Sequence, residues 1–206
     1  MKKRSLEIAL SSVEPPENPK AILEQYATPA SIVADILYFA VSMGDIADRC
    51  VADLGCGSGI FSIGSALLGA RCVIGVDVDE NSLKKALKNA GRFSELSVYL
   101  EEKRLQFMEI DVVDFDMRVD TVVMNPPFGS QTRGADRPFL EAAIRNADTV
   151  YSLHNSSTKS FVMKKVEEMG ARVTAMKNYK FPIPFMFRFH RKEKTEIDAT
   201  MFRIER

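Results

Sequence analysis

The sequence is poor in the residues that build disulfide frameworks, metal sites and membrane anchors. Its three cysteines (Cys50, Cys56 and Cys72) form neither a Cys-x-x-Cys motif nor an even set, so we expect reduced thiols in a cytoplasmic protein. The two histidines stand in no spacing typical of a metal site, and no Ser-His-Asp order indicates a covalent nucleophile. No apolar run approaches the roughly 20 residues that cross a bilayer, so no membrane span is expected.

What the chain does have is the composition of one globular domain. It holds 206 residues, of which 46% are hydrophobic and 27% charged, enough for a sizeable core and too apolar for intrinsic disorder. Glu7 interrupts the apolar stretch that a signal peptide would need after the basic tip at residues 1–4. We therefore expect an N-terminal extension or loop over residues 1–20, including the proline-bearing stretch 11–20, and a single domain over residues 21–206.

The expected elements alternate along the chain. Pro29 opens an apolar periodic run that predicts a helix ending near Gly44, with Thr28 as its N-cap. Strands are predicted at 50–54, 71–77, 104–110, 119–124 and 149–153, and helices at 59–68, 80–89, 139–146 and 160–169. Strand-like stretches at 172–180, 185–190 and 197–204 follow, the last two without an intervening helix. This alternation predicts an α/β Rossmann-like fold: a mostly parallel seven-stranded sheet with an antiparallel C-terminal hairpin and helices on both faces.

A glycine-rich turn follows the first predicted strand. The segment Asp53-Leu54-Gly55-Cys56-Gly57-Ser58-Gly59-Ile60 has a G-x-G-x-G spacing, and Ile60 stands where the dinucleotide fingerprint needs glycine. Asp53 is unsuited to a pyrophosphate, but it favours a ligand that carries a sulfonium and an ammonium. The turn resembles motif I of the class I methyltransferases, which bind S-adenosylmethionine.

Acidic residues follow the next two strands as well. Asp77 ends the second strand and is placed to accept hydrogen bonds from both ribose hydroxyls of the cofactor. Asp111 follows the third strand and is placed to meet the adenine amino group, with Val112 offering its backbone N–H.

The segment Asn125-Pro126-Pro127-Phe128 follows the fourth predicted strand. Two prolines remove two backbone donors and leave nearby carbonyls free as acceptors. The Asn125 side-chain oxygen and the Pro126 carbonyl could each accept an N–H of an amino group, turning its lone pair toward a methyl donor. Phe128 could stack on a base that has left its duplex. All four residues are therefore candidate catalytic residues.

Several further segments narrow the resemblance. They are Leu-Glu-Gln-Tyr-Ala-Thr-Pro at 23–29, Val-Asp-Val-Asp-Glu at 76–80, Tyr-Ser-Leu-His-Asn-Ser-Ser at 151–157 and Arg-Phe-His-Arg-Lys at 188–192. Together with the two motifs above they resemble the methyltransferase-like family that installs N6-methyladenosine on small-subunit ribosomal RNA. The similarity extends from about residue 20 to 205, although the family often has cysteine where Ser58 stands.

The resemblance implies a set of cofactor and substrate contacts. Its cofactor residues are Gln25, Thr28, Asp53, Gly55, Gly57, Ser58, Ile60, Asp77, Asp111 and Val112. It also implies a role for His154 near the substrate, with a packed core histidine as the alternative. The family works with a small zinc-binding activator that pairs with an exposed sheet edge, for which residues 104–110 are the candidate. Pairing of two identical chains or local shielding of that edge are the alternatives.

Charge is distributed unevenly along the chain. Residues 1–150 hold 16 Lys+Arg and 22 Asp+Glu, whereas residues 151–206 hold 12 and 6, which predicts that the C-terminal part faces a polyanion. Arg188, Arg191 and Lys192 are the candidates for phosphate contacts in RNA, with a solvated basic hairpin as the alternative.

Taken together, the motifs and the resemblance predict an RNA adenine-N6 methyltransferase. A methyltransferase for guanine N2 or a glutamine amide and a non-catalytic RNA-associated factor are the competing hypotheses.

Overall fold

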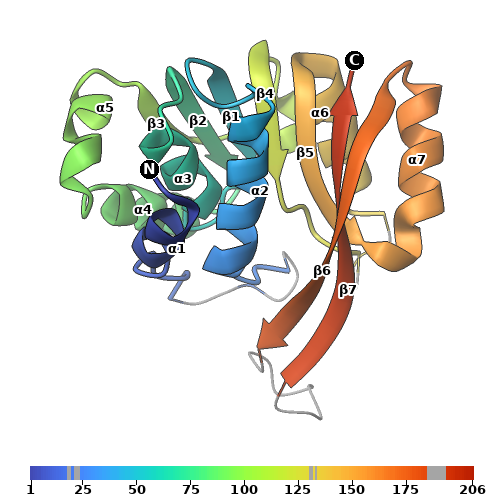
Figure 1. Ribbon diagram of the computed structural model, residues 1–206, viewed down its shortest axis with the longest axis horizontal. Coiled ribbons are helices and arrows are strands. Elements are labelled where there is room, and N and C mark those ends of the chain that lie inside the picture. The colour runs from blue at the N-terminus through green and yellow to red at the C-terminus, as the bar shows by residue number, and fades with distance from the viewer. Residues whose placement is uncertain (18–19, 21–23, 130–131, 133, 185–193) are drawn as a thin grey trace.

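A seven-stranded sheet with helices on both faces forms the centre of the molecule (Figure 1). The computed structural model describes the chain except residues 18–19, 21–23, 130–131, 133 and 185–193. The strand order is β3-β2-β1-β4-β5-β7-β6, and β7 is antiparallel to both of its neighbours. The strands are β1 (Cys50–Leu54), β2 (Cys72–Asp77), β3 (Leu105–Glu109), β4 (Val119–Met124), β5 (Ala147–Asn155), β6 (Arg172–Pro184) and β7 (Lys194–Glu205). The predicted fold class is confirmed.

Two apolar cores lie on the two faces of the sheet. One gathers the buried side chains of α1 (Lys3–Leu10), α2 (Ala30–Ser42) and α3 (Ile60–Leu67). The other gathers those of α6 (Arg137–Asn146) and α7 (Lys159–Glu168). Because helices cover both faces, the central strands are apolar on both sides, and Val51, Ala52 and Leu54 are all fully buried. Helix α4 (Glu80–Ala90) contacts β2 and β3, and α5 (Ser97–Glu101) leads into β3.

The N-terminus departs from the predicted extension or loop. Residues Lys3–Leu10 form α1, whose Leu6 and Leu10 are buried in the first core. Two apolar residues one helical turn apart are too short a pattern to reveal a helix from sequence, but contact with α2 and α3 stabilises it. Thr28 is also not the N-cap of α2, because Pro29 holds that position without a side-chain cap.

The C-terminal hairpin is formed by β6 and β7, which pair from Arg172 with Glu205 to Pro184 with Lys194. The predicted hairpin instead joins residues 185–190 to residues 197–204, and the first of these stretches lies outside the described residues. Strand β5 accompanies β7 only as far as Asn155, opposite Ala199. Beyond that pair the two long strands continue as a ribbon that projects from the sheet (Figure 1).

A disulfide joins Cys50 to Cys72, so the expectation of three reduced thiols is wrong for two of them. These residues face each other in the register of the parallel strands β1 and β2, with 4.7 Å between their Cα atoms. That spacing suits a disulfide, but only the pairing of the strands reveals it. Cys56 is the free cysteine and is buried.

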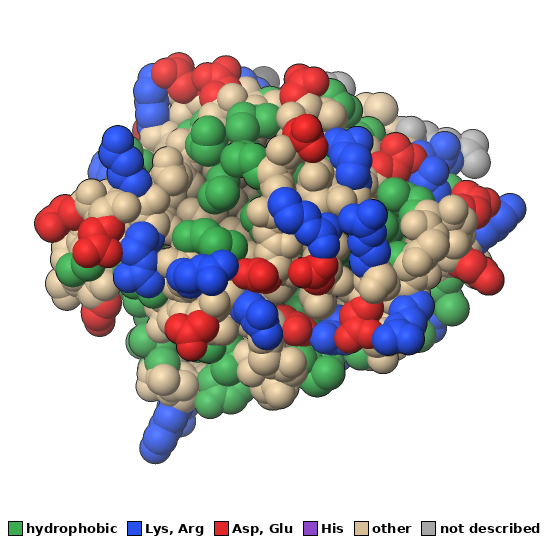
Figure 2. Space-filling model, turned by 90° about the horizontal axis from the view of Figure 1, so that it is seen from above, with side chains coloured by type: hydrophobic (Ala, Val, Ile, Leu, Met, Phe, Trp, Pro, Cys, Tyr) green, Lys and Arg blue, Asp and Glu red, His purple; other side chains and the backbone are tan. Residues whose placement is uncertain are grey.

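The end of the molecule at which the parallel strands begin carries charges of both signs (Figure 2). Arg71 pairs with Asp120 at 3.4 Å and Arg172 with Glu205 at 2.9 Å. Because acidic partners accompany these arginines, this end offers little net positive charge to a polyanion. Among the described residues, none of the helices has the length and apolar character needed to span a membrane.

Candidate active site

A cavity of about 400 Å³ opens at the end of the sheet where the parallel strands terminate. It lies beside β1 and its neighbours β2 and β4, where the strand order reverses and open α/β sheets bind their ligands. Its volume falls in the usual range for small-molecule sites. The lining includes Gln25, Thr28, Gly55, Gly57, Ser58, Ile60, Asp77, Asp111, Val112, Asn125 and Pro127 from the predicted site.

The glycine turn between β1 and α3 forms the floor of the cavity. Gly55 and Gly57 adopt φ of 70° and 52°, in the left-handed region that favours glycine. A Cβ on Gly55 would stand 2.9 Å from Cε1 of Phe139, so a side chain there would displace that ring. The N–H of Gly57 donates to Oδ2 of Asp77 at 2.9 Å, which fixes the turn against the end of β2.

Asp53 lies beneath this turn, and the cavity lining does not include it. Its Oδ2 accepts hydrogen bonds from the backbone N–H and the hydroxyl of Ser62, at 2.9 and 2.6 Å. Burial raises the pKa of Asp53 to about 7, against the lowering effect of the Ser62 hydrogen bonds. Asp53 therefore stabilises the start of α3 after the turn through Ser62 and does not line the cavity. The expected direct contact with the cofactor is corrected: the charge of Asp53 acts on the cavity only over a distance.

The other predicted cofactor residues surround the cavity. Burial raises the pKa of Asp77, whose second oxygen accepts the N–H of Asp79 at 2.9 Å. Asp111 is exposed at the rim and accepts from the N–H of Val113. Gln25 donates from Nε2 to Asp79 at 3.2 Å, which ties the segment before α2 to the start of α4. Carboxylates, exposed turn backbone and apolar walls at Ile110 and Val112 fit a cationic nucleoside such as S-adenosylmethionine.

Asn125 directly follows β4, and the two polar atoms of its side-chain amide differ in their hydrogen bonding. Its Nδ2 donates to the hydroxyl of Thr28 at 2.9 Å. Its Oδ1 is buried and has no hydrogen-bond partner among the residues that the structure describes. A buried acceptor without a partner costs free energy of about 1–3 kcal/mol, so it marks a position where a donor from a ligand is expected. Because Asn125 lines the cavity, that donor would come from a molecule bound there.

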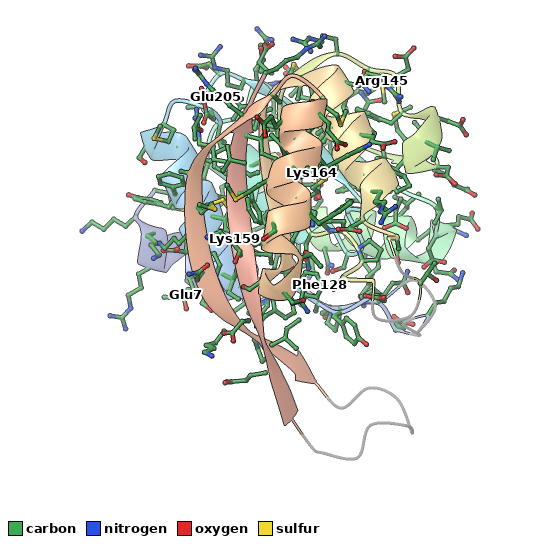
Figure 3. The ribbon with its side chains drawn as sticks, turned by 90° about the vertical axis from the view of Figure 1, so that its right-hand side faces the viewer. Glu7, Phe128, Arg145, Lys159, Lys164 and Glu205 are labelled. Carbon is green, nitrogen blue, oxygen red and sulfur yellow. A yellow bond between two sulfur atoms is a disulfide. The ribbon has the colours of Figure 1, made fainter. Side chains whose placement is uncertain are left out.

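The remainder of the proline motif is divided between the cavity and the core. Pro127 lines the cavity, whereas Pro126 is buried behind it. Phe128 contacts Phe181 of β6 edge to face, with 5.4 Å between ring centroids. Figure 3 shows Phe128 near the start of α7, at the end of the sheet from which the hairpin projects. The contact with Phe181 therefore fixes the orientation of the Phe128 ring. Stacking of this ring on a base stays a prediction.

His154 does not contact the cavity. It is 1% exposed, and its ring nitrogens lie within hydrogen-bond distance of Ser152 and Asp136. The expected direct contact with substrate is therefore corrected, and the alternative of a packed histidine is closer to the structure. Arg188, Arg191 and Lys192 lie outside the described residues, so their phosphate contacts stay a prediction.

Several further residues line the cavity that were not predicted from the sequence. Phe139 of α6 stands over the glycine turn, and Thr132 and Ala135 precede that helix. Pro16 reaches the cavity from the segment predicted as a loop. None of these belongs to a motif, and only the packing of α6 and the N-terminal segment brings them to the site. In the described part of the chain, no group of three or more His, Cys, Asp or Glu residues could hold a metal ion.

Comparison with known proteins places this site in a family. The model of the ribosomal protein L11 methyltransferase family (PrmA) matches residues 38–125. The rRNA N(6)-adenosine-methyltransferase Mettl5 of Drosophila melanogaster is 37% identical over 213 residues, covering 100% of this chain and 97% of that protein. The rRNA N(6)-adenosine-methyltransferase METTL5 of Danio rerio is 35% identical, with 98% of each chain covered.

A solved structure agrees with these relatives. The crystal structure of PH1948 from Pyrococcus horikoshii, for which an RNA methyltransferase activity has been suggested, is 41% identical and has a TM-score of 0.91. It covers 100% of this chain and 98% of its own. The likeness therefore extends over the whole chain and the whole fold and is not confined to the glycine turn. The chain belongs to the METTL5-type family of rRNA N(6)-adenosine methyltransferases.

Proposed function

We propose that this chain transfers the methyl group of S-adenosylmethionine to the N6 amino group of an adenosine in small-subunit ribosomal RNA. The observation that carries the proposal is the buried Oδ1 of Asn125, a residue of the cavity lining, which has no hydrogen-bond partner within the described ranges of the chain. An exocyclic amino group supplies the missing donor. The printed activities of the Drosophila and Danio relatives support adenosine in ribosomal RNA as its source.

The residues of the site divide the work between binding and orientation. The cofactor supplies an electrophilic methyl group when bound, held by the glycine turn, Asp77 and the rim at Asp111. Oδ1 of Asn125 and the carbonyl of Pro126 accept the two N–H bonds of the adenine amino group, which turns its lone pair toward the methyl donor. Thr28 keeps the amide of Asn125 from rotating. This catalysis rests on positioning and preorganised acceptors and needs no general base before transfer.

The test combines purified protein, methyl-labelled S-adenosylmethionine and total unmodified RNA, followed by nucleoside digestion and mass spectrometry. Label in N6-methyladenosine supports the proposal, and mapping the labelled fragment to small-subunit rRNA supports its finer part. Label in a methylated guanosine would show that the substrate is guanosine rather than adenosine, with the same cofactor site. Cofactor binding without label in any nucleoside would favour a non-catalytic RNA-associated factor.

Asp77→Ala is expected to weaken cofactor binding about 10- to 100-fold. The variant removes a carboxylate acceptor that is worth roughly 1.5–3 kcal/mol toward a hydroxyl, at 1.4 kcal/mol per tenfold change in affinity. It also removes the acceptor of the Gly57 N–H. Isothermal titration calorimetry measures the effect, with Asp111→Ala at the exposed rim as the comparison expected to lose less. An unchanged affinity in Asp77→Ala would contradict the assignment.

Cofactor affinity is expected to fall as the pH drops below about 7. The pKa of Asp53 is raised to about 7 in the free protein, so below that pH the carboxyl is protonated and its negative charge no longer attracts a cationic ligand in the cavity. One such group lowers affinity by up to about tenfold per pH unit. Titrations from pH 5.5 to 8 in buffers of different ionisation enthalpy measure both the slope and the proton release. Asp53→Asn should flatten the profile, and a flat wild-type profile would contradict the coupling.

A partner and a location complete the proposal. Strand β3 is an edge of the sheet, and the exposed side chains of Gln106, Met108 and Glu109 support an edge that another chain could pair with. We propose that a small zinc-binding activator pairs with this edge, which co-purification with the native protein would test.

Ribosomal RNA as substrate supports a cytoplasmic location. The Cys50–Cys72 disulfide counts against it, because disulfides are rare in most cytosolic proteins.

A further inference from the structure

The N-terminal strap, residues 13–17, leads from α1 to the cavity and belongs to no helix or strand. Its backbone groups therefore lack the partners that regular structure provides and need others. One side chain of α4 supplies them for Glu14. Nδ2 of Asn89 donates to the Glu14 carbonyl oxygen at 2.9 Å, and Oδ1 of Asn89 accepts the Glu14 N–H at 3.2 Å. Asn89 is 1% exposed, so its amide is shielded from water.

The same amide also contacts the glycine turn. Nδ2 of Asn89 donates a second hydrogen bond, to the carbonyl oxygen of Ser58 at 3.0 Å, and Ser58 lines the cavity. Both hydrogens and the oxygen of the amide are thus used. A buried amide costs free energy unless its polar atoms have partners, and here every partner is a backbone group of the strap or the turn. Asn89 therefore joins the strap to the turn that forms the floor of the cavity.

Two cations hold the carboxylate of Glu14. Nζ of Lys85 lies 2.7 Å from its Oε2, and Nη1 of Arg92 lies 2.6 Å from its Oε1. The backbone N–H, the carbonyl and both carboxylate oxygens of Glu14 consequently all bond to α4 or to Arg92, just after it. Because the side chain of Glu14 is exposed in part, these ion pairs contribute less than the buried amide of Asn89.

Two prolines carry the position of Glu14 to the cavity. Pro15 and Pro16 follow Glu14 directly. Each ring fixes its own φ and favours extended backbone in the residue before it, so the segment is stiff. Pro16 lines the cavity, and residues 14–16 all lie within the described part of the chain. By holding Glu14, Asn89 therefore also holds the cavity wall at Pro16.

We propose that Asn89 is a positioning residue for cofactor binding, which holds the strap as a wall of the cavity and slows the release of S-adenosylmethionine. The inference goes beyond the proposed function, because it requires the cofactor but no particular RNA. Without Asn89, Pro16 is free to move outward, while Asp77 and the rim at Asp111 stay in place to bind the cofactor. Loss of a retaining wall changes the rate of dissociation far more than the rate of association.

The experiment measures how fast tritium-labelled S-adenosylmethionine leaves the protein when unlabelled cofactor is added. Asn89→Ala removes the amide, and Pro16→Gly removes the wall without touching Asn89. Lys84→Ala is the matched control, because Lys84 lies on the same helix and pairs with Glu80 rather than with the strap. We expect koff to rise about tenfold in Asn89→Ala and about threefold in Pro16→Gly, with kon changed less than twofold. Lys84→Ala should match the wild type.

The double variant shows whether Asn89 acts through the strap. If it does, Asn89→Ala with Pro16→Gly should release the cofactor about tenfold faster than the wild type, no more than Asn89→Ala alone. Independent effects would multiply to about thirtyfold. That result would overturn the inference, because Asn89 would then act through Ser58 and the glycine turn only. Pro16→Gly changes a partly exposed residue, and a wild-type koff in this variant would overturn the inference even where Asn89→Ala does not fold.

A second measurement uses the protein without cofactor. The Glu14 N–H is hydrogen-bonded to Asn89, so hydrogen exchange followed by mass spectrometry should show faster exchange at Glu14 in Asn89→Ala. Exchange in β2 should stay unchanged. Wild-type exchange at Glu14 in this variant would contradict the role of Asn89 in holding the strap. Because both readouts concern the cofactor site alone, they decide the inference even where RNA methylation fails.

Discussion

Asn125→Ala is expected to lower kcat for RNA methylation by about 100- to 1000-fold, the usual loss when one preorganised polar group is removed from a reacting centre. The variant deletes the buried Oδ1 that has no partner in the described part of the chain, so the amino group of the substrate loses its acceptor. The cofactor site keeps its turn and Asp77, and cofactor Kd should change less than twofold. Single-turnover methylation and calorimetry on the same preparation measure the two quantities.

Thr28→Val is the informative companion to that variant. It keeps the Asn125 acceptor but removes the hydroxyl that receives its N–H. The amide is then free to rotate, and we expect a smaller loss in kcat, about tenfold. If Asn125→Ala weakened cofactor binding as much as it slowed transfer, the segment after β4 would be structural and its acceptor role would be lost.

Breaking the Cys50–Cys72 disulfide is expected to destabilise the fold by about 3 kcal/mol. The bond closes a chain separation of 22 residues, and the loss of that constraint in the unfolded chain accounts for the estimate. For a chain of this size the change corresponds to a fall in Tm of roughly 6–12 °C. Differential scanning calorimetry with and without reductant measures it.

A Cys50→Ser, Cys72→Ser double variant provides the control. Its Tm should match that of the reduced wild type and should not respond to reductant. Alkylation of the denatured, non-reduced wild type should label one thiol, that of Cys56. Labelling of all three cysteines would show that the disulfide does not form and would contradict the prediction.

Most of the parallel sheet could be predicted because its strands are short, apolar and separated by helices of ordinary length. The bounds of β1 and β4 agree with the prediction to the residue. Helix α1 could not, because its stability comes from packing on α2 and α3 rather than from its own eight residues. The disulfide could not either, since it depends on which two strands lie side by side.

The residues of the site likewise fall into those that the sequence predicts and those that only tertiary packing brings together. Asp77 ends β2 and Asn125 directly follows β4, so the topology of a parallel sheet predicts where they lie. Phe139 reaches the site only through the packing of α6, and His154 turns into the core rather than toward the ligand. Sequence periodicity predicts that His154 lies on a strand, but it does not predict whether its ring points into the cavity or contacts other buried side chains.

The two-stranded ribbon beyond Asn155 has a consequence for how such an enzyme can change its substrate. From Lys180 opposite Asp198 to Pro184 opposite Lys194, β6 and β7 pair only with each other. A two-stranded ribbon has little stability of its own, and Phe181 ties this one to the domain because its side chain is buried in the core and contacts Phe128. Chimeras that exchange the ribbon beyond Phe181 between relatives should therefore fold and bind the cofactor as before, and their RNA preference tests whether the ribbon contacts the substrate.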